Sequence, residues 1–89
     1  MKAKNNRDLA TLIDVLLKLK TEKALEDFLI GILTPKEIFE LSRRLEIVRL
    51  LKTGIQHQAI AKKLGVGVAT VTRGSRELQR GHFWWVSTK

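Results

Sequence analysis

Side chains suited to binding a nucleic acid are concentrated in the second half of this 89-residue chain. Residues 56–76 read QHQAIAKKLGVGVATVTRGSR, and no aspartate or glutamate occurs between Ile47 and Arg76. The same stretch holds the basic residues Arg49, Lys52, Lys62, Lys63, Arg73 and Arg76. A segment of one charge sign is typical of proteins that bind the phosphate backbone, although a solvated basic face has the same composition. The spacing of the apolar residues in the same segment distinguishes the two interpretations.

The apolar residues of this segment have the spacing of two short helices that cross at a tight turn. We expect one helix over residues 55–64, ended by Gly65 in the left-handed conformation, and a second over residues 68–78. The positions that must face inward are small or apolar: Ile60, Ala61, Leu64, Val66 and Val71. The pattern predicts a helix-turn-helix, whose second helix lies in the major groove of DNA. An ordinary pair of packed helices is the alternative.

The outward positions of the second helix favour DNA binding. They are small, hydroxylated or basic, with no acid before Glu77, so this face can approach a duplex and donate to phosphates and base edges. A face that only meets solvent would carry glutamates. The candidate DNA contacts are Lys62, Lys63, Val68, Ala69, Thr70, Thr72, Arg73 and Arg76.

The sequence does not support catalysis or metal binding. The chain has no cysteine, and His57 and His82 lack partners at metal-ligand spacing. Ser42 and Ser75 have no neighbouring base that would turn either hydroxyl into a nucleophile. We therefore predict neither an enzyme nor a protein with a resident cofactor.

The first half of the chain has helical rather than alternating periodicity. Leucines and isoleucines at helical spacing predict an amphipathic helix over residues 6–20. Thr21 is a suitable N-cap for a second helix that reaches about Ile32. In Thr34-Pro35-Lys36-Glu37 the threonine and the glutamate can form a capping box, which predicts a long helix that ends at Gly54. The fold class is therefore all-α, with five to six short helices.

The long helix is apolar on more of its circumference than one neighbour can cover. One face carries Ile38, Leu41, Leu45, Val48 and Leu51, and Ile47 and Leu50 widen it. Such a helix is buried on more than one side. In so short a chain a second copy is the natural source of the extra cover, so we predict a homodimer.

Size and composition indicate a single globular domain. The chain is 44% hydrophobic with a net charge of +8, and it is too short for two independent cores. Its N-terminus lacks the apolar stretch of a signal peptide and no run is long enough to span a bilayer, which predicts a cytoplasmic protein without membrane contact. We assign residues 1–33 to N-terminal dimerisation helices, 34–54 to the long core helix, 55–78 to the helix-turn-helix and 79–89 to a C-terminal tail.

Three motifs resemble those of the Trp repressor family. They are Leu33-Thr34-Pro35, Arg44 followed by Ile47-Val48, and Ala69-Thr70-Val71-Thr72-Arg73-Gly74-Ser75. The last is the most specific, because Thr-x-Thr-Arg-Gly-Ser is not required of a helix-turn-helix in general. The resemblance implies an intertwined homodimer that binds a palindromic operator in double-stranded DNA. It further implies repression of genes for tryptophan biosynthesis or transport, with L-tryptophan as corepressor.

The resemblance also implies a site for an amino-acid effector. In that family two arginines sandwich the indole ring, and they match Arg44 and Arg73 here. The threonine and the glycine that line the pocket match Thr70 and Gly74, and Glu77 stands where the family has a serine near the ligand ammonium. Across the dimer, the backbone carbonyls that receive the ammonium match Gly31, Leu33 and Thr34.

Several departures keep alternatives open. Between Gly54 and Ile60 the chain is one residue shorter than the best-known members, which resembles a second branch of the superfamily without an assigned effector. Gln58, a further candidate DNA contact, stands where the family has a base-reading arginine, so the operator sequence does not transfer. The alternatives are a superfamily regulator that ignores tryptophan, the DNA-binding module of a recombinase or transposase, and a structural or RNA-binding protein. Without the motifs, an ion pair with Glu40 would be the simpler role of Arg44.

Overall fold

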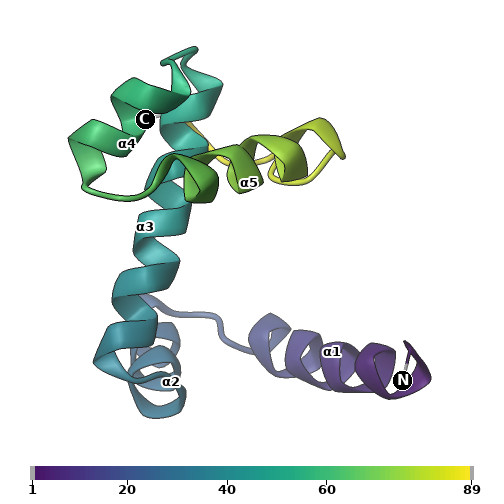
Figure 1. Ribbon diagram of the computed structural model, residues 1–89. Coiled ribbons are helices and arrows are strands. Elements are labelled where there is room, and N and C mark those ends of the chain that lie inside the picture. Colours follow the sequence, from purple (N-terminus) through teal and green to yellow (C-terminus); the bar gives the residue numbers. More distant parts are fainter. Residues whose placement is uncertain (1, 89) are drawn as a thin grey trace. The chain divides into compact units, whose positions relative to one another are not determined.

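The computed structural model describes residues 2–88 of the chain, with side chains from residue 6 onward. This range holds five helices and no strand: α1 (Lys2–Leu17), α2 (Glu22–Ile32), α3 (Pro35–Lys52), α4 (His57–Leu64) and α5 (Val68–Gln79) (Figure 1). The predicted all-α class is confirmed. The chain forms two compact units that divide after Ile38.

The observed bounds of α1 differ by a few residues from the bounds that the apolar periodicity predicted. This helix begins at Lys2, ahead of the predicted residue 6, and ends at Leu17 rather than residue 20. The amide of Lys18 donates to the carbonyl of Val15 at 3.1 Å, and that of Leu19 donates to the carbonyl of Leu16 at 3.2 Å. These three-residue turns tighten the end of the helix and stop it.

The first unit is organised by two helix caps that the sequence predicted. Thr21 Oγ1 accepts from the amide of Ala24 at 3.0 Å and begins α2. Thr34 Oγ1 accepts from the amide of Glu37 at 3.1 Å, and Glu37 Oε1 accepts from the amide of Thr34 at 2.9 Å. The capping box at the start of α3 is therefore confirmed.

The first unit leaves its apolar side chains largely uncovered. None of the side chains described between residues 6 and 38 is buried. The exposed large ones are Leu9, Leu12, Ile13, Val15, Leu16, Leu17, Leu25, Leu29, Ile30 and Ile32. Helices owe most of their stability to the burial of such a face, so this unit needs a further surface to cover it.

The second unit has a buried core where α4 and α5 pack on the C-terminal part of α3 (Figure 1). The core residues are Ile47 of α3, Ile60 and Ala61 of α4, and Val71 of α5. Leu50, Leu51, Ile55, Leu64 and Val66 pack around them and are partly buried. The inward positions predicted for these two helices are thus confirmed.

The turn between α4 and α5 depends on a left-handed glycine. Gly65 has φ +69° and ψ +34°, and the amide of Val66 donates to the carbonyl of Ala61 at 3.0 Å. A side chain is disfavoured in this region of backbone conformation, even though no atom would contact an added Cβ at this position. Gly65 therefore sets the direction in which the chain enters α5.

We expect Gly65→Ala to lower the free energy of unfolding by about 1 kcal/mol, because alanine is strained at positive φ. Gly31→Ala is the matched control, since Gly31 also has open space around its Cβ position but lies in α2. There alanine is the better helix former and should raise stability by up to about 0.5 kcal/mol. Denaturant unfolding of both variants checks the pair. Equal effects at the two glycines would contradict the conformational explanation.

Candidate functional site: a cavity under α5

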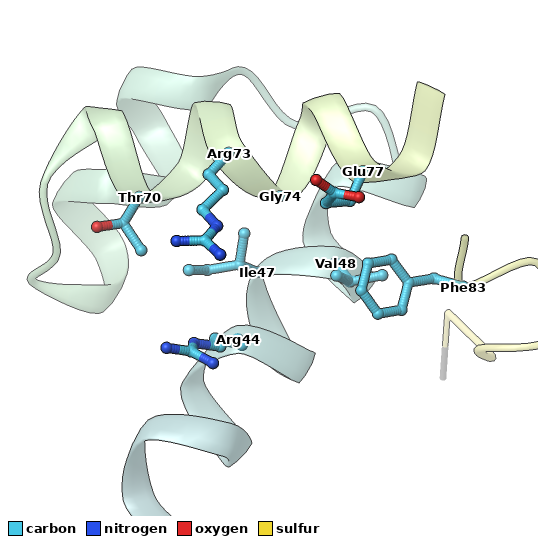
Figure 2. Close-up of a pocket in the computed structure, with 8 residues that line it drawn as sticks. All are labelled: Arg44, Ile47, Val48, Thr70, Arg73, Gly74, Glu77 and Phe83. Carbon is cyan, nitrogen blue, oxygen red and sulfur yellow. The ribbon is translucent and has the colours of Figure 1, made fainter. Parts of the chain in front are cut away.

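A cavity of about 190 Å³ lies between α3 and α5 in the second unit. Its lining residues are Arg44, Ile47, Val48, Thr70, Arg73, Gly74, Glu77 and Phe83 (Figure 2). An apolar cavity of about 150 Å³ holds one benzene ring, so this volume suits an aromatic ring system. The cavity is mostly apolar, with charged groups at its edges.

The structure brings together five of the residues predicted for an effector site. Arg44, Thr70, Arg73, Gly74 and Glu77 all line the cavity, although they come from two helices that are distant in sequence. The other three predicted positions, at residues 31, 33 and 34, belong to the first unit and are not among the lining residues. Their carbonyls were predicted to act from a partner subunit, and that role stays a prediction.

Three lining residues were not among the predicted ligand contacts. Ile47 and Val48 lie on the apolar face of α3, and the sequence showed them as core positions and as part of a motif. Phe83 lies in the tail, where the residues have no periodicity that would have indicated its place.

Gly74 lies where α5 approaches α3 closely. A Cβ at this position would lie 3.2 Å from Ile47 Cγ2 and 3.5 Å from Leu51 Cδ1. The resemblance implied that this glycine lines the ligand pocket, and Gly74 does line the cavity. The structure adds a packing role, since the missing side chain faces the core helix and allows α5 to approach it.

The two arginines at the cavity have no anionic partner among the side chains described, residues 6–88. No ion pair in this range involves Arg44 or Arg73, so the simpler role of Arg44 as a partner of Glu40 is not observed. Both side chains are exposed at the edge of the cavity (Figure 2). Their guanidinium groups can stack on an aromatic face and donate to a carboxylate.

Glu77 supplies the negative charge of the cavity. Arg80 Nη1 lies 2.8 Å from its Oε2, and His82 Nε2 lies 3.5 Å from its Oε1. The Glu77 side chain is 29% exposed, so these contacts hold it in place while leaving it accessible. Two guanidinium groups and one carboxylate around an apolar floor match an amino-acid zwitterion with an apolar side chain.

The predicted DNA-contacting residues form an exposed surface on α4 and α5. All nine are exposed except Thr72, which is half-buried. The Thr72 hydroxyl lies 3.5 Å from Nδ1 of His57, so it faces α4 rather than solvent alone. This placement favours a role for Thr72 in holding the two helices together. The other eight residues, Gln58, Lys62, Lys63, Val68, Ala69, Thr70, Arg73 and Arg76, are accessible to a large ligand.

Two other kinds of site are not seen in the described part of the chain. Between residues 6 and 88 no group of three or more histidine, cysteine, aspartate or glutamate side chains is arranged to hold a metal ion. No helix in the same range combines the length and the apolar character needed to cross a membrane.

Comparison with known proteins agrees with the sequence motifs. A family model described as "Trp repressor protein" matches residues 7–83. A "Trp operon repressor homolog" of Vibrio vulnificus (strain YJ016) is 46% identical over 66 residues, which cover 72% of this chain and 65% of that protein. The protein of the same description from Vibrio parahaemolyticus serotype O3:K6 (strain RIMD 2210633) is 35% identical over 74 residues, or 82% of this chain and 72% of the relative.

A third relative from another genus has similar agreement. The "Trp operon repressor homolog" of Photobacterium profundum is 41% identical over 68 residues, covering 75% of this chain and 66% of that protein. The match spans slightly less than two thirds of the Vibrio vulnificus protein, 65% of its length. From the match over residues 7–83 and these identities, the chain belongs to the Trp repressor family, a family of regulatory proteins and not of enzymes.

Proposed function

We propose that this protein is a DNA-binding transcriptional repressor whose affinity for its operator is raised by L-tryptophan. One observation carries the proposal: the cavity lies directly under α5, and Thr70 and Arg73 belong both to the cavity and to the exposed basic surface. A ligand in the cavity therefore contacts the same helix that would meet DNA.

The cavity supports an aromatic amino acid as effector. Ile47, Val48 and Gly74 give an apolar floor on which an indole ring can lie. Arg44 and Arg73 line the cavity, and we propose that their guanidinium groups stack on the ring and bind the carboxylate. Glu77 attracts the ammonium group, with the carbonyls of residues 31, 33 and 34 of a partner subunit proposed to complete its coordination.

The helices α4 and α5 are proposed to act as a helix-turn-helix. They pack across a glycine turn, and α5 presents exposed small, hydroxylated and basic side chains, as a helix in the major groove must. Lys62 and Lys63 lie in the last turn of α4, and we propose that they neutralise phosphates. Base contacts through ordered water are established for the Trp repressor, and the proposal includes bridging waters on that precedent.

The active form is proposed to be an intertwined homodimer. The first unit has no buried side chain among those described, and a second copy would cover its apolar faces. In a symmetric dimer the two α5 helices must reach major grooves about 34 Å apart, which makes the operator palindromic. Light scattering at micromolar concentration should show twice the mass of the chain.

Tryptophan is proposed to act by biasing the position of α5. A ligand can raise DNA affinity only as far as it binds the DNA-competent arrangement better than the unliganded one. With its ring between α3 and α5, tryptophan would hold α5 at the tilt that fits the groove. By reciprocity, the operator should raise the affinity for tryptophan by the same factor.

Selection of duplexes from a random pool tests the proposal. With L-tryptophan present, the protein should enrich palindromic sites, and without it the enrichment should be weak. Enrichment of the same sites in both conditions would instead favour a superfamily regulator that ignores tryptophan. Enrichment of single-stranded RNA over duplex DNA from a mixed pool would overturn the repressor assignment.

We expect Glu77 to strengthen selectivity for a ligand with an amine. Indole-3-propionate, which lacks the amine, should bind at least about tenfold more weakly than L-tryptophan, because it loses a charge-assisted contact. Glu77→Ser should narrow that difference to about threefold. Glu40→Ser is the matched control, since Glu40 is exposed on α3 and does not line the cavity. Calorimetry with both ligands measures the ratio, and an unchanged ratio in Glu77→Ser would contradict this role.

A further inference from the structure

We propose that the tail turn, residues 81–86, is part of the effector site and determines which amines the cavity accepts. The inference rests on the proposed function, since it assigns a further specificity determinant to the same cavity. Phe83 is the residue of the tail turn that lines the cavity. Lys52 of α3 is the residue that positions it.

Phe83 closes the cavity beside Glu77. Figure 2 shows its ring on the side where Val48 and Glu77 lie, while Arg44, Arg73 and Thr70 are on the other side. His82, the preceding residue, is bound to Glu77 twice: its amide donates to the Glu77 carbonyl at 3.1 Å, and its Nε2 lies 3.5 Å from Glu77 Oε1. The tail turn is therefore tied to the residue that attracts the ligand ammonium.

Lys52 holds the tail turn through three backbone carbonyls. Its Nζ donates to the carbonyl oxygens of Phe83 at 2.6 Å, Val86 at 2.8 Å and Trp84 at 3.3 Å. The amide of Val86 closes the turn by donating to the Phe83 carbonyl at 3.1 Å, and the Val86 side chain is buried. An ammonium group has three protons to donate, so this ring of acceptors satisfies it.

The backbone of Phe83 indicates that these contacts select its conformation. Its φ is +64°, the only positive value of a non-glycine residue among those described. Such a conformation costs free energy and persists only where the surroundings impose it. Here the Lys52 ammonium imposes it, and the result is a ring directed at the cavity rather than at solvent. The next residue, Trp84, is 81% exposed by contrast.

The Phe83 ring beside Glu77 should affect how the cavity binds the amine of the ligand. An apolar ring beside Glu77 excludes water there and strengthens the attraction between the carboxylate and an ammonium. The same ring occupies the space that a substituent on the nitrogen would need. One misfitting methyl group in a formed pocket costs roughly tenfold or more in affinity. The site should therefore prefer the primary amine of L-tryptophan to the secondary amine of Nα-methyl-L-tryptophan.

Calorimetry of the full chain with these two ligands tests the inference. The wild-type protein should prefer L-tryptophan by about tenfold or more. Phe83→Ala should weaken the binding of L-tryptophan about tenfold and reduce the preference over Nα-methyl-L-tryptophan below about threefold. Phe83→Leu keeps an apolar wall and should retain most of the affinity and most of the preference. Lys52→Met should show the same losses of affinity and preference as Phe83→Ala. Lys52→Arg should keep the wild-type preference, because a guanidinium can donate to the same carbonyls. Phe39→Ala is the matched control and should bind as the wild type does, because this phenylalanine of α3 is exposed and does not line the cavity.

The outcomes separate the inference from the function on which it rests. If the wild-type protein binds neither ligand, the proposed effector is wrong and the inference fails with it. If the wild-type protein binds L-tryptophan and Phe83→Ala keeps the same preference between the two ligands, only the inference is overturned. A loss of affinity in Lys52→Met that Lys52→Arg does not restore, with the preference unchanged, would likewise contradict the positioning role.

Discussion

Replacing Arg44 by alanine should weaken L-tryptophan binding about 100-fold and remove the effect of tryptophan on DNA affinity. The guanidinium lines the cavity and makes no ion pair with the side chains of residues 6–88 that would be lost with it. A stack on an aromatic face contributes about 1–2 kcal/mol, and a hydrogen bond to a carboxylate about 1.5–3 kcal/mol. Their sum corresponds to a loss of about 100-fold or more.

The control is the preceding arginine of the same helix. Arg43 lies over the ring of Phe39, with 4.6 Å between its Cζ and the ring centroid, and it does not line the cavity. Arg43→Ala should therefore keep tryptophan affinity within about twofold of the wild type, since it removes no ligand contact. Circular dichroism establishes that both variants fold. Wild-type tryptophan affinity in folded Arg44→Ala would remove this residue from the site.

Replacing both Lys62 and Lys63 by alanine should reduce the salt dependence of DNA binding and lower the affinity for all DNA sequences to the same extent. Both lysines are exposed in the last turn of α4. If the dimer neutralises about six phosphates, log K falls against log[salt] with a slope of about −5, at about 0.9 per phosphate. The double variant removes two contacts from each subunit and leaves two in the dimer, so the slope should become about −1.8.

The double variant Lys18→Ala, Lys20→Ala is the control for charge alone. These exposed lysines lie between α1 and α2, outside the proposed DNA surface. Their replacement removes the same number of charges as the replacement of Lys62 and Lys63. The slope of log K against log[salt] for this variant should stay at about −5, because screening limits the long-range electrostatic effect of distant charges at ordinary salt. Binding constants measured at several salt concentrations give both slopes. Equal slopes for the two double variants would contradict the assignment of the phosphate contacts to α4.

The helices were predictable because their ends carry strong local signals. Thr21, the capping box from Thr34 to Glu37, and Gly65 each fix a boundary through contacts within a few residues. The end of α1 lacks such a signal: no cap side chain marks it, and apolar periodicity alone placed it three residues too late. Periodicity identifies a helix well, but only capping contacts determine where it stops.

The cavity was predictable only where a motif encoded it. Arg44, Thr70, Arg73, Gly74 and Glu77 belong to or adjoin motifs of the family, and the packing of α5 on α3 brings them together. The place of Phe83 depends instead on Lys52, which is distant in sequence and binds backbone carbonyls. Any residue offers a carbonyl, so the sequence of the tail contains no pattern for this contact. The same applies to the contact between Thr72 and His57, which depends on how α4 crosses α5.

The affinity of the protein for a selected palindromic duplex at fixed salt, with and without L-tryptophan, tests the proposed repressor function most directly. Fluorescence anisotropy with labelled duplex gives both dissociation constants. Coupling between two sites is typically worth about 1–3 kcal/mol, so tryptophan should tighten binding at least about tenfold, and Arg44→Ala should show no change. Equal affinity of the wild-type protein with and without tryptophan would contradict the claim that the cavity under α5 controls DNA binding.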